Sequence, residues 1–201
     1  MKDFNKMFLR SSIEILEQID ENEIERIVDI LVEVREKRGR LFVIGSGGGA
    51  GHASHAVCDF RKLCEIESYA PYDNVSELTA RVNDEGWDVT LINWAKISHL
   101  NENDVVFVFS VGGGNEEKKI SENLVKIVRY AKKLNAKVVG IVGKDGGYTK
   151  QVGDAVVVIP VVDEKLITPL TEGFQAMIWH LLIAHPRLQV NAMKWESIKN
   201  K

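Results

Sequence analysis

Two histidines and two acidic residues stand at helical spacings in two distant parts of the chain. His55 and Asp59 are four residues apart, so they lie on one face if the segment is helical. Glu172 and His180 are eight residues apart, close to two full turns, and share roughly one face in the same way. If the two faces meet, two imidazoles and two carboxylates could bind Zn²⁺ or a similar ion, or could transfer protons as an acid/base set. For each histidine taken alone, a structural or surface role is the competing interpretation.

A glycine-rich turn comes shortly before His55. The apolar run 41–44 predicts a short buried strand, and Gly45-Ser46-Gly47-Gly48-Gly49 follows it before a helix-compatible segment. A strand, a glycine turn and a helix start, in this order, direct backbone N–H groups and the positive end of a helix dipole at one spot, which suits phosphate. The turn lacks the Lys-Ser/Thr ending of a P-loop, and no good second strand carries the acidic residue that a dinucleotide fingerprint requires. A tight turn that binds nothing is the alternative.

The same order of strand, glycine turn and helix recurs further along the chain. Buried strands are predicted over 104–110, 137–142 and 154–162. A charged helix from about Glu116 to Leu134, capped by Gly114 or Asn115, is expected after the second glycine turn. Strands that alternate with helices and short glycine turns predict an α/β fold, with a parallel sheet covered by helices on both faces.

Two amphipathic helices are predicted before the first strand, within residues 1–38. The first has apolar residues at helical spacing over 4–19, and the second, over 23–37, begins at a capping box formed by Asn22 and Glu25. Two such helices carry more apolar surface than one small sheet needs. We therefore expect a homo-oligomer, with packing inside one subunit as the alternative.

Length and composition indicate a single globular domain. The chain has 201 residues, of which 45% are apolar and 27% charged, and its net charge of −3 does not indicate a nucleic-acid or anionic-membrane partner. Because no apolar run approaches the roughly 20 residues of a membrane span, and the start of the chain is charged throughout, we expect neither a membrane helix nor a signal peptide. Cys58 and Cys64 are expected to be reduced thiols of a cytoplasmic protein. The expected divisions are a helical extension over 1–38, an α/β core over 39–185 and a tail over 186–201.

Six segments together are similar to sugar isomerase (SIS) domains, in which they occur in the same order. They are Gly45-Ser46-Gly47-Gly48-Gly49, the helix with His55 and Asp59, Asn83-Asp84-Glu85-Gly86-Trp87, Ser110 with its glycine turn, Gly143-Lys144-Asp145-Gly146-Gly147, and the helix with Glu172 and His180. Among SIS domains the chain most resembles bacterial phosphoheptose isomerases, over nearly its whole length. The resemblance implies an aldose–ketose isomerase that converts sedoheptulose 7-phosphate to glycero-manno-heptose 7-phosphate through an enediol. It also implies a homotetramer with active sites between subunits, and zinc in some members.

The resemblance also implies roles for individual residues. Asp59 and His180 match the family's acid/base pair, which leaves open which of the two is the base. His55 matches a histidine one turn earlier, and Glu172 stands where the family usually has glutamine, which favours a metal held by His55, Asp59, Glu172 and His180. The residues implied in substrate and phosphate binding are Ser46, Gly47, Gly48, Gly49, Asp84, Ser110, Gly112, Gly113 and Glu172.

Several positions depart from the family pattern. Gly49 replaces a serine of the phosphate cradle, Ser110 alone remains of a second Ser/Thr-rich turn, and Leu63 replaces an arginine. These changes concern the identity of the sugar phosphate more than the fold. Two other classes stay open. One is a non-catalytic SIS scaffold, such as the DnaA-binding initiation factor type. The other is a sugar-phosphate sensor, a class usually joined to a DNA-binding domain, which two N-terminal helices with few basic residues do not make.

Overall fold

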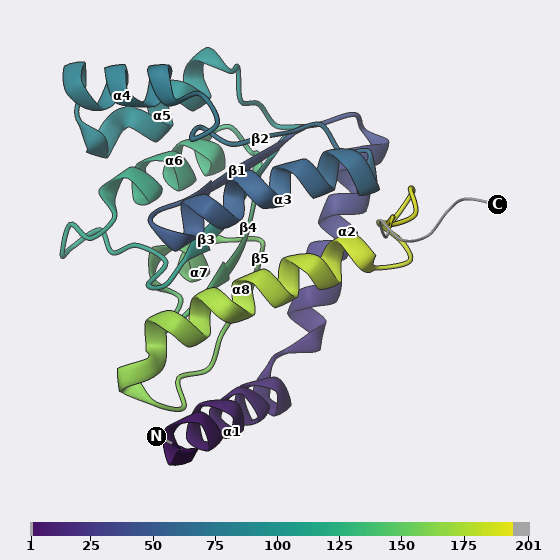
Figure 1. Cartoon of the computed structure of the whole chain (residues 1–201). Coiled ribbons are helices and arrows are strands. Elements are labelled where there is room, and N and C mark those ends of the chain that lie inside the picture. The colour runs from purple at the N-terminus through teal and green to yellow at the C-terminus, as the bar shows by residue number, and fades with distance from the viewer. Residues whose placement is uncertain (1, 195–201) are drawn as a thin grey trace.

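The computed structural model describes residues 2–194, which form a five-stranded parallel sheet with helices on both faces (Figure 1). The strand order is β2-β1-β3-β4-β5, and every pair is parallel. The strands are β1 (Leu41–Gly45), β2 (Ser68–Tyr69), β3 (Val105–Ser110), β4 (Lys137–Val142) and β5 (Ala155–Val158). The predicted α/β fold is confirmed. The last strand is shorter than predicted, because it ends at Val158 and not at residue 162.

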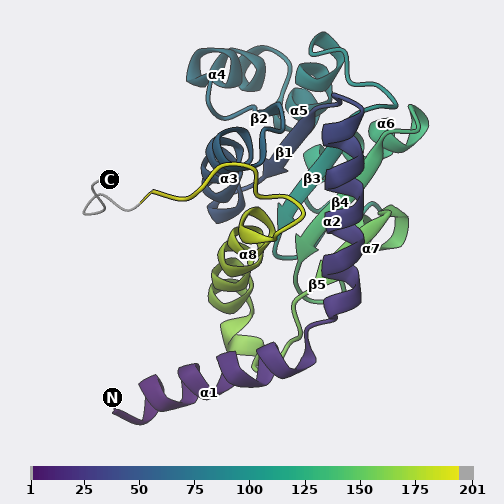
Figure 2. The ribbon, with the colours of Figure 1, turned by 90° about the vertical axis from the view of Figure 1, so that its right-hand side faces the viewer.

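Eight α-helices lie within the described residues, and two of them precede the sheet as predicted. The helices are α1 (Lys2–Gln18), α2 (Glu21–Glu36), α3 (Gly48–Cys64), α4 (Val75–Asp84), α5 (Trp87–Ile97), α6 (Glu122–Lys133), α7 (Gly147–Val152) and α8 (Ile167–Ala184). Helices α2, α3 and α8 cover one face of the sheet, and α5, α6 and α7 cover the other (Figure 2). None of the helices in this part of the chain is long and apolar enough to cross a membrane.

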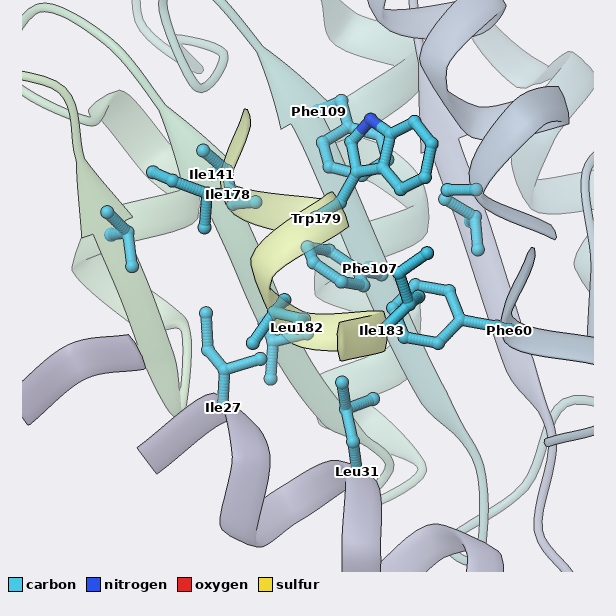
Figure 3. Close-up of a cluster of buried hydrophobic side chains, with 14 of the residues drawn as sticks. Ile27, Leu31, Phe60, Phe107, Phe109, Ile141, Ile178, Trp179, Leu182 and Ile183 are labelled. Carbon is cyan, nitrogen blue, oxygen red and sulfur yellow. The ribbon is translucent and has the colours of Figure 1, made fainter. Parts of the chain in front are cut away.

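Each face of the sheet has its own apolar core, because successive side chains of a strand point to opposite faces. In β1, Leu41 and Val43 pack toward α2, α3 and α8, whereas Phe42 and Ile44 pack toward α5 and α6. Figure 3 shows the first of these cores, in which Trp179 of α8 is almost fully buried. Strands covered on both faces are apolar along their whole length, which explains why the sequence shows continuous apolar runs without alternation.

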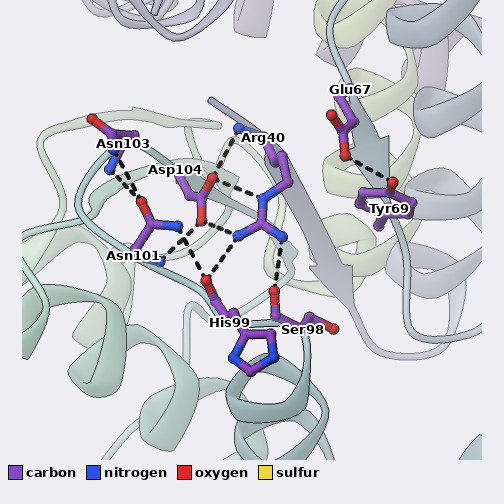
Figure 4. Close-up of polar contacts among 8 residues, drawn as sticks. All are labelled: Arg40, Glu67, Tyr69, Ser98, His99, Asn101, Asn103 and Asp104. Atoms are coloured by element: carbon purple, nitrogen blue, oxygen red, sulfur yellow. Dashed lines mark hydrogen bonds and ion pairs between the residues drawn. The ribbon is translucent and has the colours of Figure 1, made fainter. Parts of the chain in front are cut away.

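A buried ion pair fixes β1 and β3 at the edge of the sheet where both strands begin. Asp104, only 1% exposed, accepts hydrogen bonds from Arg40 Nη2 at 2.8 Å and from the Arg40 backbone N–H at 2.9 Å. The same guanidinium donates to the carbonyl oxygens of Ser98 and His99 (Figure 4). This network lies at the opposite end of the strands from the glycine turns. It therefore supports the architecture, and His99 takes part in it through its backbone carbonyl alone.

Two predicted helix starts differ from the structure. Helix α2 begins at Glu21 because Asp20 is its N-cap and accepts a hydrogen bond from the Asn22 N–H, so the predicted capping box is wrong. Helix α6 begins at Glu122, six residues later than predicted. The side chain of Asn115 accepts a hydrogen bond from the Lys118 N–H at 2.8 Å, and this local turn replaces the first turn of the expected helix.

Helix α1 extends away from the rest of the molecule (Figures 1 and 2). Ile15 is fully buried against the core, but the remaining apolar face is largely open. The exposed apolar residues of α1 are Phe4, Met7, Leu9, Ile13 and Leu16. At the other end of the chain, Leu188 is fully buried and the N–H groups of Val190 and Asn191 donate to the Leu63 carbonyl. The first part of the expected tail therefore packs on the core, while residues 195–201 lie outside the described residues.

Candidate active site

His55, Asp59 and His180 come together on neighbouring helices, an arrangement that their spacing in the sequence allowed. Helices α3 and α8 lie side by side on one face of the sheet (Figure 1). One potential ligand atom of each residue lies within 4.8 Å of the corresponding atoms of the other two. His55 Nε2 is 3.6 Å from Asp59 Oδ2, and the rings of His55 and His180 meet edge to face at 5.5 Å between centroids. We call these three residues the helix-pair group.

The tautomer of His180 follows from its backbone contact. His180 Nδ1 lies 2.7 Å from the carbonyl oxygen of Ala176, which can only accept a hydrogen bond. Nδ1 therefore carries a proton and donates it, which leaves Nε2 of the neutral ring with a free lone pair. This hydrogen bond also fixes the orientation of the ring. His180 can thus take up a proton or bind a metal ion through Nε2.

The helix-pair group suits a divalent metal ion in its chemistry and in the spacing of His55 and Asp59. Two imidazoles and one carboxylate are a usual three-residue ligand set for Zn²⁺. Tetrahedral ligands at 2.0–2.2 Å from the ion are roughly 3.3–3.6 Å apart, and the His55–Asp59 separation matches this spacing. The contact between His180 and the Ala176 carbonyl is the kind of support that metal-bound histidines usually have. The residues present therefore fit such an ion.

Glu172 was predicted to bind a metal together with His55, Asp59 and His180. In the structure it is not part of the helix-pair group. Its carboxylate lies at the start of α3, where a Cβ atom added to Gly48 would come within 2.5 Å of Glu172 Cδ and 2.6 Å of both carboxylate oxygens. Glycine is needed at this position for such a close approach. The positive end of the α3 dipole stabilises a negative charge at this point. The predicted four-residue ligand set is thus reduced to three within one chain.

His52 is part of the surroundings of Glu172, although it was not among the predicted site residues. Burial lowers the pKa of His52, and the negative charge of Glu172 opposes this effect. The His52 ring also packs edge to face on Phe109 of β3, with 6.2 Å between centroids. His52 follows Gly48 by four residues, about one helical turn. This spacing in the sequence could have indicated that His52 lies on the same face of α3 as Gly48.

The predicted phosphate-turn residues lie at the ends of two neighbouring strands, β1 and β3. Gly47 is the N-cap of α3 with φ = 57°, and Gly49 approaches the Phe109 carbonyl so closely that a Cβ atom would be 2.5 Å from its oxygen. Ser110 Oγ accepts a hydrogen bond from the Gly113 N–H at 3.0 Å, so this hydroxyl shapes the turn after β3. Gly112 lines a cavity of about 700 Å³ together with Lys118 and Lys144.

A second cavity opens where β1 ends, and Ser46 is among its lining residues. Its volume is about 440 Å³, and it is lined by Ser46, Trp87, Asp88, Lys119, Ser121, Glu122 and Asn123. We call it the switch-point cavity, because β1 and β3 are the strands between which the order of an open α/β sheet reverses. Lys119 and Asn123 were not predicted as site residues. With a helix start at residue 116, both residues were expected inside the helix and away from its first turn.

Asp84 is not brought to the helix-pair group within one chain. It is the last residue of α4, it is exposed, and its carboxylate accepts a hydrogen bond from Asn83 at 2.7 Å. Gly86, with φ = 94°, separates α4 from α5. The role implied for Asp84 therefore remains a prediction.

Comparison with known proteins gives one family and a consistent set of relatives. The model of the SIS domain family matches residues 7–143. The lincomycin biosynthesis protein LmbN of Streptomyces lincolnensis is 32% identical over 163 residues, which are 78% of this chain and 59% of that protein. The phosphoheptose isomerase of Helicobacter pylori strain P12 is 26% identical over 89% of this chain and 88% of that protein. Among solved structures, phosphoheptose isomerase GmhA from Neisseria gonorrhoeae superposes with a TM-score of 0.77 at 20% identity, covering 91% of this chain and 97% of that one.

Proposed function

The chain belongs to the SIS domain family, and we propose that it is an aldose–ketose isomerase of a sugar phosphate. Sedoheptulose 7-phosphate is the substrate to test first, with glycero-manno-heptose 7-phosphate as product. Relatives that match over most of both chains are phosphoheptose isomerases, which supports this reaction. The observation that carries the proposal is the helix-pair group, which places one carboxylate and two imidazoles within 4.8 Å of one another.

The reaction needs one proton moved between neighbouring carbons. A base removes a proton from C1 of the ketose, the electron pair forms the C1=C2 bond, and the C2 oxygen takes a proton to give the enediol. The O1 proton then leaves as the C1 carbonyl forms, and a proton is delivered to C2. We assign the carbon-to-carbon transfer to Asp59 and the transfer at oxygen to His180 Nε2, since Nδ1 is held by Ala176. The reverse assignment of the two residues predicts the same variants to be inactive.

The same three residues, His55, Asp59 and His180, would hold a divalent ion such as Zn²⁺. When bound, the ion would polarise the substrate carbonyl as a Lewis acid. A carboxylate bound to metal is a poorer base, so metal binding and proton transfer by Asp59 compete. Elemental analysis of the purified protein and of the His55→Ala variant distinguishes the two, because only a metal site loses its ion in the variant.

Assembly bears on the site, because the helix-pair group lies on an open surface. His55 has 61% of its side chain exposed, and the apolar residues Met177 and Leu181 on α8 are 40% and 41% exposed. A second copy of the chain covering this surface would exclude water and strengthen the electrostatic interactions there. We propose a homotetramer in the cytoplasm with sites shared between subunits. No observation favours the scaffold or sensor alternatives over the isomerase.

The test is direct conversion of sedoheptulose 7-phosphate by the pure protein, followed by chromatography of the sugar phosphates with and without added Zn²⁺. Asp59→Asn and His180→Gln should each lower kcat/KM by about 10²–10⁴-fold while the protein stays folded. His185→Gln is the matched control, since His185 lies just after the same helix and contacts Glu25 on the surface. Full activity in folded Asp59→Asn protein would contradict the assignment.

A further inference from the structure

Trp179 connects the helix-pair group to the apolar core. Its indole stacks on the ring of His180, with 3.4 Å between ring centroids and 29° between the ring planes. It also meets the ring of His55 edge to face, at 4.7 Å between centroids. Within residues 2–194, Trp179 is the aromatic side chain that contacts both imidazoles. The two histidines thus share one neighbour, although they come from different helices.

The indole is itself held rigidly. Trp179 is only 1% exposed and belongs to the core between α3, α8 and the sheet. Figure 3 shows it in the same core as Phe107 of β3 and Ile183 of α8. Protein cores are packed as densely as organic crystals, so a large buried ring keeps one rotamer. Trp179 therefore offers a fixed surface against which other side chains can be oriented.

The two imidazoles need such a surface, because both residues are exposed. His55 has 61% of its side chain exposed, and exposed side chains change rotamer within nanoseconds unless neighbours hold them. His180 has a second support in the contact of its Nδ1 with the Ala176 carbonyl. The separation of 3.6 Å between His55 and Asp59 is too long for a hydrogen bond, so the orientation of His55 depends chiefly on its ring contacts.

The indole nitrogen indicates that core packing alone does not account for a tryptophan here. Trp179 Nε1 is buried and has no hydrogen-bond partner among the described residues. An unpaired buried donor is costly, and leucine or phenylalanine would fill a core position without one. What the smaller side chains lack is the flat area of two fused rings, which lets one residue meet two imidazoles at once.

We infer that Trp179 is a positioning residue of the helix-pair group, which holds the rings of His55 and His180 in one mutual orientation. This inference rests on the proposed function, in which the two imidazoles bind an ion or move protons. Either role requires the ring nitrogens to be held within about 0.5 Å and about 10–20° of their working geometry. Trp179 acts through the two histidines and does not itself touch the reacting atoms.

Three variants separate positioning from core packing. Trp179→Leu keeps an apolar side chain but removes the flat ring, whereas Trp179→Phe keeps one ring. Phe107→Leu is the matched control, because it removes an aromatic ring from the same core, at a residue whose aromatic contacts are Phe60 and Phe109. In thermal unfolding, both leucine variants should lower Tm by several degrees. Trp179→Phe should stay closer to the wild type, since it also removes the unpaired N–H.

NMR reads the orientation of the rings without any turnover. The full chain is labelled with ¹³C at histidine Cε1, which gives one signal for each of its five histidines. His55→Gln and His180→Gln assign the two relevant signals, at about pH 8.5, where unperturbed imidazoles are neutral. Because an aromatic ring current shifts the protons stacked on it upfield, the His180 signal should lie upfield of its position in the unfolded chain. In Trp179→Leu both signals should move toward their unfolded positions, whereas in Phe107→Leu they should stay.

Steady-state turnover of sedoheptulose 7-phosphate gives the second readout. Misplaced acid/base groups slow the reacting step more than they weaken substrate binding. Trp179→Leu should therefore lower kcat by about 10–100-fold with little change in KM. Trp179→Phe should lose less, because one ring still supports His180, and Phe107→Leu should keep the wild-type kcat despite its lower Tm.

The two readouts distinguish failure of this inference from failure of the proposed function. Unchanged His55 and His180 signals in folded Trp179→Leu, or an equal loss of kcat in Phe107→Leu, would overturn the inference. Moved signals with an unchanged kcat would also overturn it and leave the isomerase intact. Moved signals without any turnover by the wild type would support the ordering of the rings by Trp179 and remove the isomerase.

Trp179→Phe decides the question if Trp179→Leu does not fold. A lower kcat at nearly the wild-type Tm, with the two histidine signals moved, would support the positioning role. Wild-type kcat together with wild-type signals would overturn it, because a single ring would then serve as well as the indole.

Discussion

Gly48→Ala should separate stability from activity, because the group that a new Cβ atom meets is the end of a flexible side chain. The added carbon would come within 2.5–2.6 Å of the Glu172 carboxylate. The carboxylate can swing away, whereas a backbone atom at this distance could not. The substitution thus displaces Glu172 from the start of α3 without disturbing the sheet.

The expected energies nearly cancel. Alanine favours a helix over glycine by up to about 1 kcal/mol, and less in the first turn. Loss of a carboxylate at a helix start costs about 0.3–1 kcal/mol, and up to about 2 kcal/mol where it is partly buried. The free energy of unfolding should therefore change by about 1 kcal/mol or less, which corresponds to a few degrees in Tm for a chain of this size. If Glu172 positions substrate, kcat/KM should fall by about tenfold or more.

Gly113→Ala is the matched control for this experiment. Gly113 has φ = 67°, and an added Cβ atom would be 1.8 Å from the carbonyl oxygen of Gly146, which is backbone and cannot move aside. This variant should lose about 3–4 kcal/mol or fail to fold. Both variants are measured by thermal unfolding and by turnover of sedoheptulose 7-phosphate. Wild-type kcat/KM in Gly48→Ala would refute a role for Glu172 in the site, and unfolding of Gly48→Ala would refute the reasoning about its flexible neighbour.

Three further predictions concern charge, thiols and assembly. Burial acts to raise the pKa of Asp154, but hydrogen bonds from Lys132 and the Val138 N–H outweigh this effect, so the pKa is lowered. Asp154→Asn should therefore lower the free energy of unfolding by about 1–3 kcal/mol at pH 7. Denaturant titrations should find that this difference shrinks as the pH falls below about 4. Burial raises the pKa of Cys64 to about 11, so a thiol reagent at pH 8 should modify exposed Cys58 alone in the native protein and both cysteines after unfolding. Light scattering at micromolar concentration should show that the wild type is an oligomer. The double variant Leu9→Lys, Ile13→Lys on the exposed face of α1 should have a lower mass than the wild type. A monomeric wild type would exclude sites shared between subunits.

Local patterns predicted most of the sheet and the helix face that His55 and Asp59 share. The apolar runs of β1, β3 and β4 are continuous because both faces of the sheet are covered, and such runs identify a buried strand without knowledge of its neighbours. The four-residue spacing of His55 and Asp59 likewise predicts that the two side chains lie on the same face of one helix. The meeting of these residues with His180 depends on α3 and α8 packing together, which the spacing allowed but could not establish.

The remaining features depend on contacts that no local pattern encodes. Glu172 and His180 are eight residues apart, and the helix turns them to different neighbours, so Glu172 reaches Gly48 and leaves the helix-pair group. The late start of α6 results from a turn around Asn115, a residue whose side chain competes with the helix for the backbone. That shift carries Lys119 and Asn123 to the switch-point cavity, where continuous helix had been expected.

The most direct test of the central claim, that the helix-pair group moves a proton between two carbons, is isotope exchange in D₂O. Wild-type protein is incubated with sedoheptulose 7-phosphate, and the product is examined by NMR for deuterium on C2 of the aldose. The account predicts deuterium at C2 in the part of the wild-type product formed after the proton on Asp59 has exchanged with solvent, and neither product nor exchange with folded Asp59→Asn and His180→Gln. Product formation or exchange by folded Asp59→Asn at the wild-type rate would contradict it.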